Sequence, residues 1–69
     1  MKVGDFVRGK PGCPNVGIYG IVVGTPRIVF ERFSLDKHVM MVKVKNFRNG
    51  ENWVSDSPIE FLEVLSEAR

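Results

Sequence analysis

The fold of this chain is decided by the stretch Val42-Lys43-Val44-Lys45-Asn46-Phe47-Arg48-Asn49-Gly50-Glu51-Asn52-Trp53-Val54. The strict alternation of valine and lysine from Val42 to Lys45 predicts a strand with one buried and one solvated face. The Asn49-Gly50 step is a strong hairpin signal, because both residue types tolerate a positive φ. We therefore expect a strand over residues 39–46 and a hairpin that turns at residues 48–50.

Two registers are compatible with this hairpin. A two-residue loop would be a type I′ turn and would pair Lys45 with Val54, whereas a three-residue loop with a G1 bulge would pair Lys45 with Trp53 and Val44 with Val54. We favour the three-residue loop, because it leaves one face wholly apolar. In that register the inner face carries Val42, Val44 and Val54. The other face carries Lys43, Lys45 and Trp53.

The rest of the chain up to residue 56 also favours short strands. Seven glycines and four prolines divide it into pieces that have no helical period. We expect strands over residues 5–8 and 16–24, a loop over 9–15, and a projecting ribbon over 27–33. The predicted buried residues are Val7, Ile21, Val42, Val44, Val54 and Leu62, and Lys43 and Lys45 are predicted to be exposed.

The C-terminal residues 57–68 allow two interpretations. Ser57-Pro58-Ile59-Glu60 has the pattern of a capping box with proline at N1, which would begin a helix. Alternatively, residues 57–60 form one 3₁₀ turn, and a closing strand follows with Leu62 and Val64 pointing inward. We favour the strand, because four short strands leave an edge that a fifth can cover.

Composition limits the class of protein. The chain has 69 residues, of which 43% are hydrophobic and 26% charged, so we expect a single globular domain over residues 1–69. Because it has neither an apolar run of about 20 residues nor a signal-peptide core, we expect a soluble, cytoplasmic protein. One cysteine, Cys13, and one histidine, His38, can supply neither an internal disulfide nor a four-ligand zinc site. We predict no metal and no cofactor.

Charge is unevenly distributed along the chain. Residues 1–50 carry nine basic and three acidic side chains, a net charge of +6, and residues 51–69 have a net charge of −4. A fold that kept these two halves apart would have a basic and an acidic side.

The predicted order of elements resembles the SH3-like small barrel. The segments that carry the likeness are Asn49-Gly50-Glu51, Trp53-Val54-Ser55 and Phe61-Leu62-Glu63-Val64-Leu65. The resemblance implies an all-β barrel of five strands, to which a C-terminal helical turn could be added. It does not imply binding of proline motifs, because Tyr19 is the only tyrosine and the first strand lacks the aromatic run of true SH3 domains.

Two narrower resemblances bear on function. Gly4-Asp5-Phe6-Val7, followed by Gly17-Ile18-Tyr19-Gly20-Ile21-Val22, is similar to the start of a KOW motif, the version of this barrel found in ribosome- and polymerase-associated proteins. That likeness implies binding of nucleic acid or of a nucleoprotein. The whole pattern also resembles small uncharacterised proteins of tailed phages, which implies a viral origin, residence in the host cytoplasm and no established chemistry.

The residues give little support to catalysis. Nucleophilic catalysis requires a base within hydrogen-bond reach of the nucleophile, and Cys13 and His38 are the one such pair available. They fit better as a loop thiol and a residue at the start of a strand. The glycines from Gly17 to Gly24 lack the Gly-Lys-Ser/Thr ending of a phosphate loop and fit bulges instead. We therefore predict no catalytic residues.

Basic residues interleaved with aromatics indicate one kind of binding site. Lys43 and Lys45 share a face with Trp53 in the favoured register, an arrangement that suits phosphates and stacked bases. The candidate nucleic-acid-binding residues are Arg27, Arg32, Lys43, Lys45 and Arg48. Alternatively, the lysines and Trp53 form a cation–π cluster that shields an edge.

The excess of aromatic residues indicates another kind of site. A barrel this small cannot bury five phenylalanines and Trp53 together, so some should be exposed. Exposed Phe30 and Phe33 on the ribbon would favour a protein partner or self-association, although both could instead fold over an open end of the barrel. Our first hypothesis is a non-catalytic module that binds a host or viral protein, or itself, through Phe30, Phe33 and Trp53. The alternative is a KOW-like binder of nucleic acid.

Overall fold

The computed structural model describes residues 1–30 and 38–68, with only the backbone of Phe30 and His38. Within this part of the chain the regular structure is β apart from one 3₁₀ turn, so the predicted all-β fold class is confirmed. The elements in chain order are β1 (Phe6–Gly9), β2 (Tyr19–Val22), β3 (Arg27–Phe30), β4 (His38–Arg48), β5 (Glu51–Pro58), η1 (Ile59–Phe61) and β6 (Leu62–Ser66).

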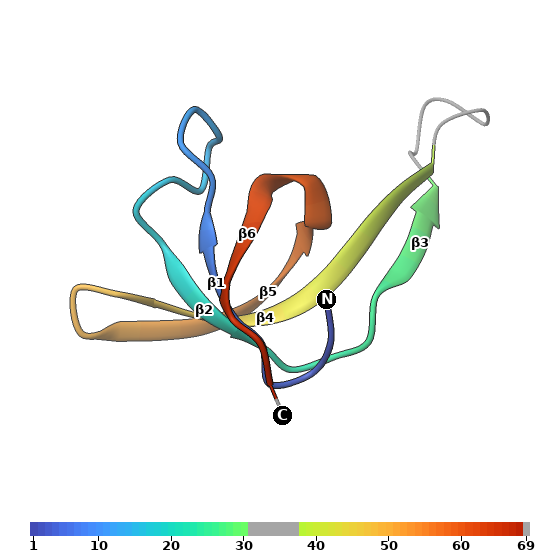
Figure 1. Ribbon diagram of the computed structural model, residues 1–69. Coiled ribbons are helices and arrows are strands. Elements are labelled where there is room, and N and C mark those ends of the chain that lie inside the picture. Colours follow the sequence, from blue (N-terminus) through green and yellow to red (C-terminus); the bar gives the residue numbers. More distant parts are fainter. Residues whose placement is uncertain (31–37, 69) are drawn as a thin grey trace.

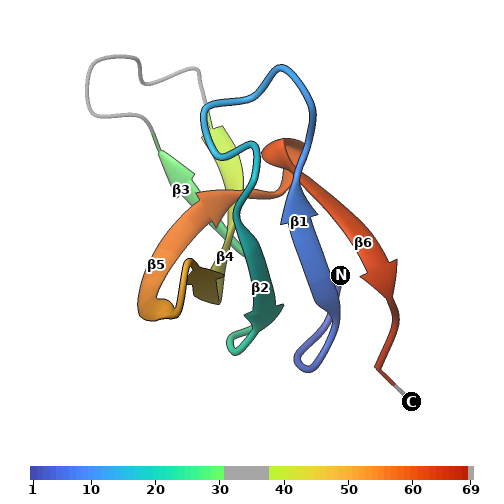
Figure 2. The ribbon, with the colours of Figure 1, turned by 90° about the vertical axis from the view of Figure 1, so that its left-hand side faces the viewer.

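The strands form one antiparallel sheet that curls strongly, as a small barrel requires (Figure 1 and Figure 2). Five of them follow the order β5-β4-β2-β1-β6. The sixth, β3, pairs with residues 38–41 of β4, which is long enough to pair with β2 further along. The described residues thus contain six strands rather than the expected five, because residues 27–30 form a strand of their own. We call β3 and residues 38–41 the β3–β4 ribbon; it projects from the body of the molecule (Figure 1).

The hairpin between β4 and β5 has the two-residue turn, so the register we favoured is wrong. Asn49 has φ 51° and Gly50 has φ 80°, the positive pair that a type I′ turn requires. Lys45 therefore pairs with Val54, and Asn46 pairs with Trp53. The conformation of Asn49 and Gly50 sets the register, and not the preference for a wholly apolar inner face. The residue opposite Trp53 is consequently the buried Asn46 rather than a lysine.

The buried Asn46 is compatible with the core because its amide group is hydrogen-bonded. Its Nδ2 donates to the Ser55 hydroxyl at 2.8 Å and to the Val44 and Trp53 carbonyl oxygens at 3.3 Å. A buried polar group with partners loses little on desolvation. The asparagine thus occupies a position that the sequence pattern reserves for an apolar residue.

The core is a small cluster of aliphatic side chains on the inner side of the curled sheet. Its buried residues are Val7, Val22, Val42, Val44 and Leu62. Four of these were predicted, and Lys43 and Lys45 are exposed as expected. The prediction is wrong for Ile21 and Val54, which face outward, and Val22 takes the place expected for Ile21.

Gly20 explains why Val22, rather than Ile21, is buried. It faces inward next to β4, where an added Cβ would lie 2.4 Å from Val44 Cγ1 and 2.9 Å from the Lys45 carbonyl oxygen. Only glycine permits this approach of β2 to β4. Because side chains alternate along a strand, the inward Gly20 fixes Val22 inward and Ile21 outward.

The C-terminal segment forms the turn and strand that we favoured over a helix. After β5 the chain makes the single 3₁₀ turn η1, and β6 then pairs with the free edge of β1. The Lys10 amide donates to the Phe61 carbonyl oxygen at 2.8 Å and fixes this return. Pairing with β1 gives hydrogen-bond partners to the backbone groups along the free edge of that strand. This gain outweighs the helical propensity of the segment.

The two ends of the chain are joined through a buried carboxylate. Asp5 accepts a hydrogen bond from the Lys2 amide at 2.9 Å and one from the Ala68 amide at 2.8 Å. These two bonds, that from Ala68 first, hold the pKa of Asp5 below its usual value. The segment before β1 is thus fixed to the segment after β6.

Candidate functional site

The side chains that alternate with the core residues form a second apolar surface, on the outer side of the sheet. Phe6 of β1 lies beside Ile21 of β2. On β4, Lys45 lies between Ile21 and Val54. In the adjacent row Tyr19 lies beside Phe47. We call the outer apolar face the set Phe6, Tyr19, Ile21, Phe47 and Val54.

Aromatic contacts hold the side chains of this face in place. The rings of Phe6 and Tyr19 are stacked, with centroids 6.0 Å apart and planes at 14°. The Lys45 Nζ atom lies 5.8 Å from the centroid of the Phe47 ring, within cation–π range. Because these contacts restrict the rings before any partner binds, less side-chain entropy is lost on binding.

The outer apolar face is exposed although it lies on paired strands. Val54 is 55% exposed and Tyr19 44% exposed, and Phe6 and Ile21 are both 37% exposed. Single exposed apolar residues are common on protein surfaces, whereas these lie on three strands and are joined by the half-buried Phe47 of β4 into a patch. Such a patch has the apolar character of an interface core.

The arginines beside this face are paired with carboxylates. Arg8 Nε contacts Glu63 Oε2 at 2.9 Å, and Arg27 Nη2 contacts Asp56 Oδ2 at 2.7 Å. The bond to Glu63 holds the pKa of Arg8 above its usual value. Each pair joins the basic part of the chain to the acidic part, so the expected separation into a basic and an acidic side does not hold for these residues.

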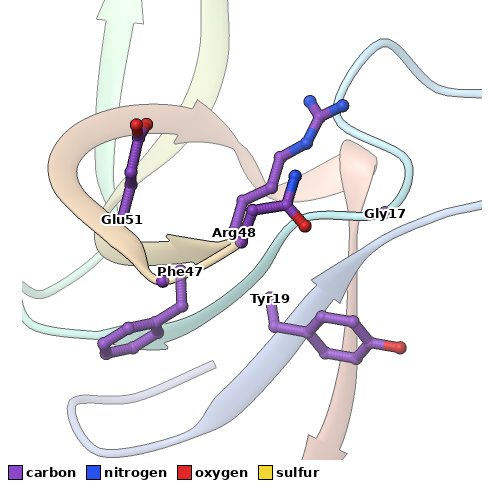
Figure 3. A pocket seen from close by; sticks show the side chains of 7 residues that line it. Gly17, Tyr19, Phe47, Arg48 and Glu51 are labelled. Carbon is purple, nitrogen blue, oxygen red and sulfur yellow. The ribbon is translucent and has the colours of Figure 1, made fainter.

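A hollow of about 340 Å³ lies where the outer apolar face meets the hairpin turn (Figure 3). Its lining includes Tyr19 of β2, Phe47 and Arg48 of β4 and Glu51 of β5. Gly17, in the loop before β2, completes the rim. The hollow is open to solvent, so it extends the outer apolar face toward the turn and does not enclose a substrate.

The predicted protein-binding residues are not brought together. Trp53 pairs with Asn46 on the inner side of the sheet, at 38% exposure, and is not beside the lysines as the rejected register required. Phe30 pairs with His38, eight residues earlier on β4, which at about 3.3 Å per residue separates it from Trp53 by up to about 26 Å. Phe33 lies outside the described residues.

The predicted nucleic-acid-binding residues are spread over the outer side and the turn. Lys43 lies opposite Asp56, which binds Arg27, and these three side chains line a further hollow of about 300 Å³. Lys45 lies within the outer apolar face, and Arg48 lies beside the turn. Arg32 lies outside the described residues. The basic side chains are therefore interrupted by carboxylates and do not form a continuous stripe.

The outer apolar face was not predicted from the sequence. One sequence feature indicated this face. The Asn49-Gly50 step favours a two-residue turn, which places Val54 beside Lys45 and outside the core. The inward Gly20 gave a second signal, since it turns Tyr19 and Ile21 outward together. We gave more weight to a wholly apolar inner face than to the turn.

The residues considered for catalysis lie in different elements. Cys13 is half-buried in the loop between β1 and β2, and His38 begins β4. Among the described residues there is no group of three or more His, Cys, Asp or Glu side chains that could hold a metal ion. The described part of the chain also contains no helix with the length and apolarity needed to cross a membrane.

No protein-family model, curated protein or solved structure matches the chain.

Proposed function

We propose that this protein is a non-catalytic binding module that contacts a partner protein through the outer apolar face. The observation that carries the proposal is the exposure of apolar side chains on β1, β2 and β5, with the half-buried Phe47 of β4 among them, on the side opposite the core. These side chains are not part of the hydrophobic core, whose members lie on the inner side. A protein interface requires such a surface.

The chemistry of the face favours a protein over a nucleic acid. Ile21 and Val54 are aliphatic and cannot stack on bases as aromatic rings can. Glu63 and Asp56 at the borders neutralise arginines that phosphates would otherwise contact. Lys45 contributes a positive charge within the apolar set. The expected partner surface is therefore apolar, with a carboxylate that can reach Lys45.

The resemblance to tailed-phage proteins suggests the kind of partner and where the contact takes place. On that likeness the partner is a host or a viral protein and contact occurs in the host cytoplasm. Phe30, in β3, remains a candidate contact outside the outer apolar face, and Phe33 remains a candidate from the sequence.

A second candidate function is the binding of single-stranded nucleic acid. One observation favours it: Lys45 lies over the Phe47 ring, and Tyr19 lies in the same row. Exposed rings beside a lysine can stack on bases while the ammonium group meets a phosphate. The KOW-like residues at the start of the chain imply the same kind of partner.

A capture experiment with a matched pair of variants tests the first function. The intact chain is immobilised and exposed to host-cell lysate, with and without nuclease. Val54→Glu places a charge in the outer apolar face, where it can pair with Lys45 across the strands and leave the fold intact. Ile28→Glu is the control, because Ile28 is also in a strand and is 56% exposed against 55% for Val54.

We expect one protein to be retained by the wild type and by Ile28→Glu after nuclease treatment, and to be lost with Val54→Glu. Moderate salt should weaken capture only mildly, since the contact is largely apolar. Capture that disappears with nuclease would contradict this function. Steeply salt-dependent oligonucleotide binding that falls with Lys43→Ala and Lys45→Ala would favour the second candidate.

A further inference from the structure

Three strands of the sheet pair along one side only. In the described part of the chain, β3 and β5 each pair with β4 alone, and β6 pairs with β1 alone. The outer edge of each strand presents backbone amide and carbonyl groups to which another strand can bond. The side chains along these edges decide which of them is protected.

The edges of β5 and β6 carry the residue types that block pairing. β5 contains Glu51, Pro58 and the ion-paired Asp56, and β6 contains Glu63, which is paired with Arg8. Charged residues and proline are the usual means by which proteins keep an edge strand single. The edge of β5 is therefore protected against a further strand, whereas the one charge of β6, Glu63, is already paired.

The edge of β3 lacks this protection. Its first residue, Arg27, is neutralised by Asp56, and the residues that follow are Ile28, Val29 and Phe30. All three have high strand propensity, and none carries a charge. Neither β3 nor β6 thus has an unpaired charge within the strand, and what distinguishes β3 is its place in the β3–β4 ribbon.

The β3–β4 ribbon also exposes apolar side chains where it projects from the body of the molecule (Figure 1). Ile28 pairs with Met40 across the ribbon, and both are exposed, at 56% and 42%. A two-stranded ribbon is marginally stable in water unless more strands or another element join it. The ribbon would gain stability from strands added at β3.

We propose that β3 pairs antiparallel with β3 of a second copy of this chain, so that the two ribbons form a four-stranded sheet across a two-fold axis. A two-fold contact requires a self-complementary surface, and an edge strand that pairs with itself satisfies this automatically. In an antiparallel pair, directly opposed side chains point to the same side of the sheet. The two-fold axis must therefore pass through a residue and not between two residues. Ile28 and Val29, in the middle of β3, are the residues that can lie on it. The Ile28–Met40 patches of both copies then lie side by side.

The charge and size of the ribbon favour a second copy as the occupant. The ion pair of Arg27 with Asp56 removes the charge that two facing β3 strands would otherwise share. The chain is also nearly neutral overall, at +2, so long-range repulsion between copies is weak. A foreign strand would need its own apolar residues in matching register, whereas a second copy already has them.

This contact is independent of the proposed function. Ile28 and Met40 share the side of β4 that carries Val42 and Val44, whereas Lys45, Phe47 and Val54 lie on the opposite side. A dimer joined through β3 therefore leaves the outer apolar face of each copy accessible. The two ideas can fail separately.

Sedimentation velocity of the intact chain tests the proposal. We expect the mass to rise with concentration from 7.8 kDa toward twice that value. Ile28→Glu should weaken dimerisation by at least about tenfold, because it puts like charges near the axis. Val54→Glu, at nearly equal exposure, should leave the dimer unchanged.

A disulfide trap tests the same contact without relying on a destabilising change. In a Cys13→Ser background, Ile28→Cys or Val29→Cys should form a covalent dimer under mild oxidation, since opposed Cα atoms in a sheet lie within disulfide range. Val54→Cys should form far less. A chain that stays monomeric at every concentration would overturn the proposal. So would a dimer that Val54→Glu dissociates and Ile28→Glu does not, because its contact would then be the outer apolar face.

Discussion

At the scale of single residues, Gly50 has the largest influence on which side chains reach the surface. Together with Asn49 it adopts the left-handed backbone that makes a two-residue turn. That turn places Val54 beside Lys45 rather than beside Val44. A shift of one residue in the hairpin register thus decides whether Val54 lies in the core or in the outer apolar face.

Replacing Gly50 by alanine should destabilise the protein by about 1–2 kcal/mol, because an L side chain resists a φ of 80°. Denaturant unfolding measures the loss. Arg48→Ala, beside the turn and exposed, is the control and should change the free energy of unfolding by less than about 0.5 kcal/mol. Equal stability of Gly50→Ala and the wild type would contradict the type I′ turn.

Asp5 gives the protein a stability that depends on pH. Its folded-state pKa is lowered by the amides of Ala68 and Lys2, so the stabilisation is present above about pH 4, the usual range of an aspartate, and is lost as pH falls through the lowered pKa. The melting temperature of Asp5→Asn should therefore be reduced at neutral pH and should fall less steeply on acidification than that of the wild type.

The control for this pH effect is Glu60→Gln, which removes an exposed carboxylate from η1. It should keep the acid-dependent fall of the wild type. If Asp5→Asn and Glu60→Gln gave the same profile as the wild type, the carboxylate would not join the two ends of the chain.

At the scale of elements, the close approach of β2 to β4 depends on Gly20. Gly20→Ala should lower the free energy of unfolding by about 1–3 kcal/mol, the usual cost of overpacking, because the added methyl group meets Val44 and the Lys45 backbone. Gly24→Ala is the matched control. Its added methyl group would lie 3.1 Å from the Lys43 Cβ atom alone, so the cost should be clearly smaller. Denaturant unfolding that ranks the two in reverse would show that β2 and β4 are further apart.

The strands themselves could be predicted from the sequence, because alternation and turn residues are local signals. The strands before and after Gly50 and the closing strand at Leu62 follow from such patterns. The register could not be predicted from the apolar pattern, because the buried Asn46 is stabilised by a hydrogen bond to Ser55 nine residues later. The ribbon over residues 27–33 was predicted as a prolongation of the strand before it, with a turn at residues 34–37 that lies outside the described residues, whereas β3 is a strand separate from β2.

At the scale of the whole molecule, the uneven charge of the chain does not become two charged sides. Arg8 and Glu63 are distant in sequence but adjacent in the sheet, and the Arg27 side chain reaches Asp56 across β4. Exposed pairs of this kind stabilise a fold by less than about 1 kcal/mol. Their larger effect is on the surface, where Glu63 and Asp56 offset the charge of the exposed arginines and favour an apolar contact over a phosphate-rich one.

Of the candidate site, the sequence predicted the exposure of the lysines but not the apolar surface around them. A surface made of single residues from four strands has no signature along the chain, because its members are separated by 15 or more residues in places and meet only once the register is fixed. Trp53 shows the converse error, since a shift of one residue in the hairpin moves it to the inner side.

The free energies of unfolding of Val44→Thr and Val54→Thr test most directly whether the outer apolar face is a surface that folding does not need. Threonine keeps the shape and strand propensity of valine and adds one hydroxyl group. Val44→Thr should lose about 1–3 kcal/mol, because that hydroxyl is buried without a partner, and Val54→Thr should lose less than about 0.5 kcal/mol. Losses of equal size would place Val54 in the core and contradict the outer apolar face.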